Sequence, residues 1–134
     1  MCNVRRGFSL LELLVALAVL GILAAICYPS YQQYVLRTYR AEATAQLLQL
    51  AAAQEQYLAD YGVYTDDLSA LGGAALSPSE RYEFQIQLSE ANLAFDITAE
   101  AEGLQRSDSD CLFYSVNQFG QRNVQYPHSL ACWD

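Results

Sequence analysis

The hydrophobic pattern of the chain begins with an apolar run of membrane-spanning length. Residues 7–29 read GFSLLELLVALAVLGILAAICYP, a run interrupted by a serine and by one charged residue, Glu12. As a helix, Phe8 to Tyr28 would extend about 31 Å, close to the roughly 30 Å hydrocarbon thickness of a bilayer. Arg5 and Arg6 precede the run, and basic residues at that position favour insertion with the basic end of the segment on the cytoplasmic side. The pattern predicts a helix that crosses a membrane once.

A second helical pattern, amphipathic in character, follows Pro29. Tyr31 to Tyr61 is rich in Ala, Leu, Gln and Glu, which are good helix formers. Its apolar positions recur at spacings of three and four along one face, with one glutamine in the stripe: Leu47, Leu50, Ala51, Gln54, Tyr57, Leu58 and Tyr61. Gly62 follows and suits a helix end in the left-handed conformation. We expect one helix from about Ser9 to Tyr61, roughly 80 Å long.

The C-terminal half alternates apolar and polar residues with the period of β-strands. A small-residue connector, Tyr64 to Pro78, separates it from the helix. The predicted strands are 82–88, 93–99, 111–116 and 121–126, with turns at 89–92 and 117–120 and a loop at 103–110. The expected fold is therefore α+β: a long N-terminal α-helix, membrane-spanning in its first half, packed against a C-terminal antiparallel sheet of about four strands.

Charge restricts the partners of the chain. The formal net charge is −8 and becomes −10 if Arg5 and Arg6 are removed, and the sequence has no lysine. Such a surface disfavours nonspecific nucleic-acid binding. A DNA receptor would need a local basic patch, for which the predicted globular part offers Arg81, Arg106 and Arg122.

The four cysteines differ in their predicted surroundings. Cys2 lies in the basic N-terminal segment, and Cys27 lies in the apolar helix, where a packing role is expected. Cys111 and Cys132 fall in the part that would face an oxidising compartment. A bridge between them would stabilise the fold by about 3 kcal/mol. Zinc binding by these two cysteines and His128 is the rival interpretation, but a fourth soft ligand and a zinc-type spacing are missing.

Catalytic chemistry is poorly represented in the sequence. His128 is the single histidine, and no phosphate-binding glycine loop or nucleophile elbow occurs. Asp66/Asp67 and Asp108/Asp110 are weak calcium candidates, better explained as solvated loops. We expect neither enzymatic activity nor a cofactor or metal.

Glu12 carries the strongest functional signal. A carboxylate opposes membrane insertion by about 2.5–3.5 kcal/mol near the bilayer centre and by less toward its edge, and such groups usually have a functional partner. A cut between Gly7 and Phe8 would create a positive α-amino group one helical turn from Glu12. That amine would belong to this copy or to a neighbouring one.

The residues R-R-G-F-S-L-L-E, followed by an apolar helix, resemble the class III signal of type IV pilins and pseudopilins. The resemblance implies that a prepilin peptidase cuts between Gly7 and Phe8 and N-methylates Phe8. It also implies that Glu12 is matched to the amine of a neighbouring subunit during filament assembly.

Two helix breakers, Gly21 and Pro29, lie inside the predicted helix. Proline kinks a helix or destabilises it by about 3 kcal/mol, and glycine destabilises a helix by about 1 kcal/mol relative to alanine. Both are also common in membrane helices. The family shares both breakers, and its assembled filaments are melted between them. We therefore favour a segment from Gly21 to Pro29 that extends in the filament.

The C-terminal part is similar to minor pilins of the PilE/ComP-like group. The similarity lies in C-L-F-Y-S-V-N-Q-F-G-Q-R, from Cys111 to Arg122, and in the pair Cys132-Trp133. It implies a minor type IV pilin that is incorporated into pili or primes their assembly, with roles in twitching motility, cell adhesion or DNA uptake. The implied partners are major and minor pilins, the prepilin peptidase and the inner-membrane assembly machinery.

The resemblance also implies a division of the chain and a location. The expected parts are a leader peptide (1–7), a transmembrane and assembly half-helix (8–29), an amphipathic half-helix (30–62) and a globular head (63–134). The protein would cross the inner membrane once, with its head in the periplasm, and would reach the pilus and cell surface after assembly.

Four alternatives stay open: a major pilin, a type II secretion pseudopilin, a DNA-uptake receptor pilin, which charge does not support, and an adhesin. The aromatic candidates for an adhesin are Tyr64, Phe119, Tyr126 and Trp133, which are better explained as core or disulfide-covering residues.

Overall fold

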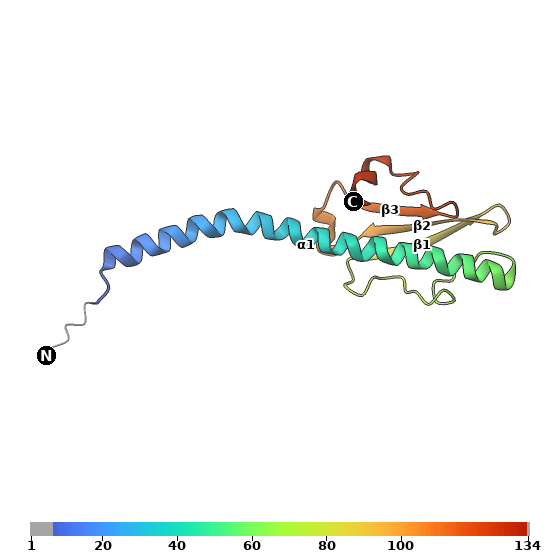
Figure 1. Ribbon diagram of the computed structural model, residues 1–134, viewed down its shortest axis with the longest axis horizontal. Coiled ribbons are helices and arrows are strands. Elements are labelled where there is room, and N and C mark those ends of the chain that lie inside the picture. The colour runs from blue at the N-terminus through green and yellow to red at the C-terminus, as the bar shows by residue number, and fades with distance from the viewer. Residues whose placement is uncertain (1–6, 134) are drawn as a thin grey trace. The chain divides into compact units, whose positions relative to one another are not determined.

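The computed structural model describes residues 7–133, which form one long helix, a three-stranded sheet and two 3₁₀-helices (Figure 1). Helix α1 runs from Leu10 to Tyr61 without interruption. The sequence predicted this helix from about Ser9 to Tyr61, so its end is confirmed and its start differs by one residue. The chain divides into two compact units, residues 1–35 and 36–134, which are described separately.

The first unit consists, in its described part, of a short non-helical segment and the beginning of α1. Its apolar side chains are exposed, for example Leu11 and Ile22 at 71% and 62%. This part of α1 is long and apolar enough to cross a membrane. Because an all-round apolar surface is stable in lipid rather than in water, this segment agrees with the predicted membrane span.

In the second unit, α1 contributes one buried stripe, formed by Ala43, Leu47, Leu50 and Gln54. The amide of Gln54 donates to the Thr65 carbonyl (2.5 Å) and accepts from the Thr65 N–H (3.1 Å). The chain therefore folds back beneath the end of the helix at this point. The apolar stripe predicted to Tyr61 is not buried to its end: Leu58 is half-buried and Tyr61 is 68% exposed.

Gly62 ends the helix as predicted. Its φ angle is +76°, a conformation that glycine adopts without steric cost, and its N–H donates to the Leu58 carbonyl at 2.8 Å.

The sheet is antiparallel, with the order β1-β2-β3. Its strands are β1 (Tyr82–Ser89), β2 (Ala94–Ala101) and β3 (Phe113–Asn117). The predicted alternation of the first hairpin is confirmed, with Ile86 paired to Ile97. Both limits of β1 and β2 lie within two residues of the predicted ones, and β3 starts two residues later and ends one residue later than predicted. The predicted loop 103–110 contains a 3₁₀-helix, η1 (Gly103–Ser107).

The predicted fourth strand, 121–126, is wrong. This segment makes one isolated bridge, Val116 to Arg122, and then Asn123 takes a φ of +48°. The Asn123 side chain accepts from the Ser115 N–H (2.6 Å) and donates to the Phe113 carbonyl (3.2 Å). The Asn123 backbone N–H donates to the Ser115 carbonyl at 2.9 Å, but its amide side chain takes the other two β3 backbone groups, which a strand's backbone would otherwise pair. The 3₁₀-helix η2 (Pro127–Trp133) follows.

The core of the second unit lies between the buried stripe of α1 and one face of the sheet, as the layers in Figure 1 show. Its largest fully buried apolar side chains include Leu47, Tyr82, Ile97 and Tyr114. Each contributes on the order of 1.5–3 kcal/mol through removal of apolar surface from water.

Candidate functional site

The predicted processing site lies in the non-helical segment before α1. Gly7 and Phe8 are exposed, Phe8 at 84%, and a Cβ atom added at Gly7 would meet none of the described atoms within 4 Å. Arg5 and Arg6, the basic part of the motif, lie outside the described residues. An exposed, non-helical peptide bond is accessible to a protease, so the geometry is compatible with cleavage between Gly7 and Phe8.

Glu12 lies in the first turn of α1, where the Ser9 carbonyl accepts the first helical hydrogen bond from Leu13 at 3.1 Å. A carboxylate in the first turn interacts favourably with the positive end of the helix dipole, typically by about 0.3–1 kcal/mol. A new amine at Phe8 would add positive charge at the same end of the helix. Glu12 thus has a stabilising environment in its own helix as well as the predicted partner amine.

Gly21 and Pro29 lie within regular helix in the structure. A Cβ atom added at Gly21 would meet nothing within 4 Å, so packing in this structure does not require a glycine there. The segment from Gly21 to Pro29 is helical in the single subunit, and its extension in a filament stays a prediction.

The predicted disulfide is formed between Cys111 and Cys132. Both cysteines are buried, at 2% and 8% exposure. The bond joins the segment before β3 to η2, and the Ser129 hydroxyl of η2 donates to the Asp110 carbonyl at 3.2 Å. The C-terminal segment is thus fixed covalently and by a hydrogen bond to the same stretch of chain.

No group of three or more His, Cys, Asp or Glu side chains suited to a metal ion occurs among residues 7–133. Of the calcium candidates, Asp67 accepts hydrogen bonds from the Ser69 hydroxyl and N–H, which lower the pKa of this carboxyl. Asp108 is bound by an arginine instead.

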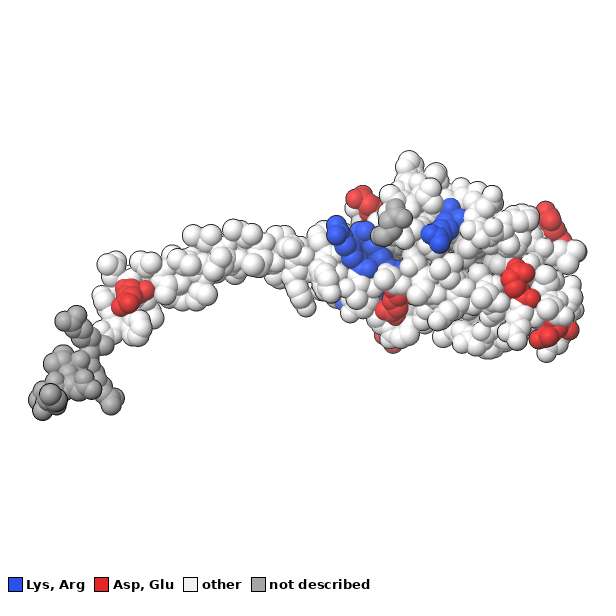
Figure 2. All heavy atoms as spheres, in the orientation of Figure 1, with Lys and Arg blue, Asp and Glu red and all other residues white. Residues whose placement is uncertain are grey.

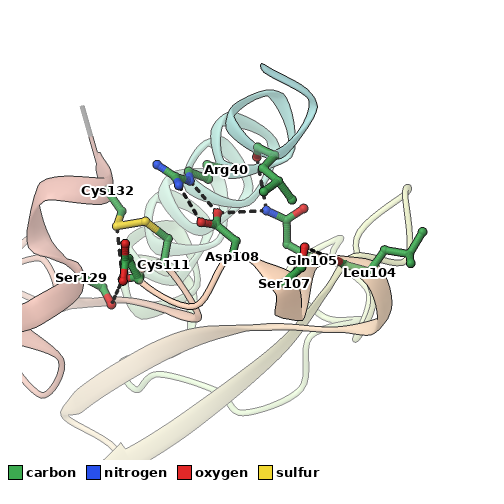
Figure 3. A network of polar contacts seen from close by, with 10 residues as sticks. Arg40, Leu104, Gln105, Ser107, Asp108, Cys111, Ser129 and Cys132 are labelled. Atoms are coloured by element: carbon green, nitrogen blue, oxygen red, sulfur yellow. Dashed lines mark hydrogen bonds and ion pairs between the residues drawn. A yellow bond between two sulfur atoms is a disulfide. The ribbon is translucent and has the colours of Figure 1, made fainter. Parts of the chain in front are cut away.

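The Arg40–Asp108 ion pair is the main polar contact that sequence reasoning missed (Figure 3). Arg40 Nε and Nη2 each donate to one Asp108 carboxylate oxygen at 2.6 Å. Gln105 Nε2 donates to Asp108 Oδ2 (3.3 Å) and to the Leu36 carbonyl (3.2 Å). The hydrogen bond to Asp108 raises the pKa of Arg40. This network ties α1 to η1 and to the segment that leads to Cys111.

A sequence signal for this pair existed. Arg40 is three residues before Ala43 and seven before Leu47, so it shares their helix face. Charged residues on a buried face are almost always paired, so Arg40 predicts an acidic partner, although its position in the sequence predicts no particular one.

Basic and aromatic side chains gather beside the disulfide. The Arg122 guanidinium lies over the Trp133 ring, 4.8 Å from its centroid, and Trp133 Nε1 donates to Asn123 Oδ1 at 3.0 Å. A small cavity next to them is lined by Arg37, Arg40, Ala41, Thr44, Cys132 and Trp133. Figure 2 shows blue atoms of basic residues close together on this unit.

The basic positions expected in the head do not form one patch. Arg81 stacks on the Tyr39 ring at 4.1 Å, and Arg106 pairs with Glu102 at 2.8 Å. Arg122 lies over Trp133, which lines the same cavity as Arg37 and Arg40 of α1.

The four aromatic candidates for an adhesin differ in their packing: three contact other aromatic rings and one is exposed. Tyr64 is buried and contacts Phe95 edge-on at 4.8 Å. Tyr126 stacks on Phe113, with 4.7 Å between the ring centroids. Trp133 packs edge-on against Tyr114 at 5.8 Å. The expected core or covering role agrees with these three contacts, whereas Phe119 is 76% exposed.

An apolar N-terminal helix that continues into the helix layer of an antiparallel sheet, with a C-terminal disulfide, is the architecture of pilin-type proteins. Two family models match the chain: "Type IV minor pilin ComP, DNA uptake sequence receptor" over residues 29–115, and "Prokaryotic N-terminal methylation motif" over residues 2–28. The chain belongs to the type IV pilin family.

Individual relatives agree with this assignment. The fimbrial protein EcpC of Eikenella corrodens is 38% identical over 97 residues, which cover 72% of this chain and 63% of EcpC. The type IV major pilin PilA of Myxococcus xanthus is 29% identical, over 84% of this chain and 52% of PilA. The type IV major pilin PilE of Neisseria gonorrhoeae is 34% identical, over 58% of this chain and 46% of PilE. The chain thus spans about half to two thirds of the length of these relatives.

A solved type IV pilin from Shewanella oneidensis shares the fold, with a TM-score of 0.57 and 21% sequence identity, over 74% of this chain and 98% of that one.

Proposed function

We propose that the chain is a minor type IV pilin that is incorporated into type IV pili or primes their assembly. The observation that carries the proposal is the match of residues 29–115 to the minor pilin model. Several relatives are named major pilins, so a major subunit is the competing assignment. In this function the chain has a structural role, and motility and adhesion would be properties of the assembled filament.

The proposed maturation uses the N-terminal motif. A prepilin peptidase removes residues 1–7 and methylates Phe8, and the match to the methylation motif over residues 2–28 supports this step. Before assembly, residues 8–29 span the inner membrane while the amphipathic half-helix (30–62) and the head (63–134) face the periplasm. During assembly, the inner-membrane machinery moves the subunit into the pilus, where Glu12 meets the Phe8 amine of a neighbouring pilin.

Abundance distinguishes the minor from the major subunit. Filaments sheared from the source cells are digested, and the peptides of this chain are quantified by mass spectrometry against those of the other pilins. A trace amount that begins at N-methylated Phe8, beside a much more abundant pilin, is the expected result. Dominance of this chain would make it the major pilin. Its absence from filaments, with processed protein in the membrane, would favour a pseudopilin.

DNA reception is a second candidate, favoured by the arginines beside Trp133. The matching model describes a DNA uptake sequence receptor, and Arg37, Arg40 and Arg122 lie around this indole. The net charge of −8 opposes bulk DNA binding, so any affinity must come from this local cluster.

Trp133 is the only tryptophan of the chain, so its fluorescence reports on this cluster directly. Duplex DNA is titrated into the detergent-solubilised chain at several salt concentrations. If Arg122 contacts a phosphate, Arg122→Gln lowers the affinity and reduces the slope of log K against log salt by about one. Arg106→Gln makes the same charge change at a residue paired elsewhere and should have little effect. Binding that is absent, or that both variants weaken equally, would reject the receptor assignment.

A further inference from the structure

Three tyrosines lie on one side of α1 at the end of its apolar run. Tyr28, Tyr31 and Tyr34 are exposed by 65%, 67% and 71%. In an α-helix, each step of three residues turns the side chain by 60° relative to the previous one. The three rings therefore lie within about 120° of the helix circumference, and all three belong to the unit of residues 1–35.

We propose that Tyr28, Tyr31 and Tyr34 form a tyrosine belt that binds the membrane–water interface and fixes the depth of the helix in the membrane. The inference rests on the proposed membrane-anchored state before assembly. Tyrosine is enriched at both bilayer interfaces because its ring is apolar and its hydroxyl is polar. Here the Tyr28 hydroxyl also accepts a hydrogen bond from Gln32 Nε2 at 2.9 Å, which adds an amide to the polar side of the belt.

The length of the apolar segment places the belt at the correct depth. From Leu10, where α1 begins, to Tyr28 the helix rises about 27 Å, so a span of about one hydrocarbon thickness ends close to the tyrosines. From Tyr28 to Tyr34 the helix rises about 9 Å, whereas the headgroup region of one leaflet is about 5–8 Å thick. A helix tilt within the usual range of 0–40° brings the three rings into this layer together.

A fixed depth has a consequence for Glu12. This residue lies 16 positions before Tyr28, about 24 Å along the helix. With the belt at one interface and a helix tilt of 0–40°, the Glu12 carboxylate lies about 6–12 Å from the opposite edge of the hydrocarbon core, away from the bilayer centre. The insertion cost of a carboxylate is lower there than at the bilayer centre, and this depth is close to that of an amine at Phe8.

A neighbouring helix is the alternative occupant of this face, and the size of the three side chains argues against it. Helices that associate in lipid favour small residues at the contact, because these allow close approach. Large tyrosines on one side prevent close approach, whereas they suit an interface of lipid headgroups and water.

The native thiol of Cys27 provides a depth probe beside the belt. In the described residues it is the one free cysteine, since Cys111 and Cys132 form the disulfide. The full chain, with Cys2→Ser, is reconstituted into phosphatidylcholine/phosphatidylglycerol vesicles at low protein density. The rate of Cys27 alkylation by a membrane-impermeant maleimide is then measured. Resistance to carbonate extraction is measured in parallel and tests membrane anchoring independently.

Replacing all three belt tyrosines by serine should release the segment toward water and increase the alkylation rate at least tenfold, without loss of carbonate resistance. Replacing all three by tryptophan, which prefers the same interface, should leave the rate within about twofold of wild type. Tyr61→Ser, at a tyrosine that is 68% exposed in the other unit, is the matched control and should change nothing.

An unchanged or slower rate in the triple serine variant would overturn the belt. Wild-type protection that weakens as protein is diluted in lipid would also overturn it, because a second copy would then be the occupant. Extraction of the wild type by carbonate would instead reject the membrane-anchored state on which the belt depends.

Discussion

Removal of the Cys111–Cys132 disulfide provides a quantitative test of how the head is stabilised. The bond closes a loop with a sequence separation of 21. In the chain-entropy model, a loop of this length stabilises the folded state by about 3.3 kcal/mol at 25 °C. We expect the double variant Cys111→Ala/Cys132→Ala to lose this amount, with at most about 1 kcal/mol more from the small voids left in a buried site.

The expected loss is large for a unit of this size. A change of 1 kcal/mol shifts the Tm of a 60–100-residue domain by roughly 4–8 °C, so the double variant should unfold at least about 12 °C below wild type. The assays are thermal unfolding, which measures this shift, and urea unfolding, which measures the free energy, both on the full chain in detergent micelles and followed by Trp133 fluorescence. Because Trp133 lies next to Cys132 and reports local changes first, circular dichroism should give the same midpoint.

Reductant provides the matched control for this prediction. Reductant should lower the free energy of unfolding of the wild type to that of the double variant, and it should not change that of the double variant. A loss below about 1 kcal/mol, or a wild type that reductant does not affect, would refute the reasoning. The packing of η2 against Tyr114 would then suffice to hold the C-terminal segment.

Three further predictions concern the helix and the core. Glu12→Gln should insert into membranes as wild type does yet be strongly depleted from sheared filaments, because the partner amine loses its carboxylate; normal incorporation would remove the proposed role. Gly21→Ala should raise local helix stability by about 1 kcal/mol and reduce incorporation into filaments if the segment must extend, whereas unchanged incorporation would argue against melting. Burial raises the pKa of Tyr82 to about 12, above the ordinary value of about 10 for the unfolded chain. The stability that depends on its protonation is therefore complete below pH 10 and is lost as pH rises through 12. Tyr82→Phe should reduce, but not abolish, the loss of stability between pH 8 and pH 11 in urea unfolding, since burial also raises the pKa of Tyr114. An identical loss in the variant would contradict this cause.

The elements that local sequence determines were predicted well. Helix α1 ends at Tyr61 because Gly62 supplies the left-handed residue that a helix end needs. The hairpin of β1 and β2 follows from strict alternation, since a shift of one residue would expose every core side chain. The N-terminal motif was identified by its resemblance to the class III signal of type IV pilins, and the match of residues 2–28 to the methylation motif agrees with it.

The features that sequence missed depend on contacts between distant residues. The apparent strand at 121–126 fails because the Asn123 amide hydrogen-bonds the backbone of β3, a competition that strand periodicity does not register. Arg40 and Asp108 are 68 residues apart, so no local pattern links them. The basic cluster beside Trp133 was missed for the same reason, as it joins α1 to the C-terminal segment.

The disulfide and the Arg40–Asp108 pair act on the same stretch of chain for different physical reasons. The disulfide stabilises the fold mainly by restricting the unfolded chain. The ion pair adds little net stability, because desolvation of both charges offsets much of their attraction. Loss of either partner would nevertheless leave an unpaired charge in a buried site, since Asp108 is only 6% exposed. Its main effect is therefore positional: Asp108 fixes η1 against α1, and Gln105 adds a contact to the Leu36 carbonyl. Cys111 follows three residues later, so the ion pair determines where the disulfide, and with it Trp133 and its arginines, lies relative to the helix.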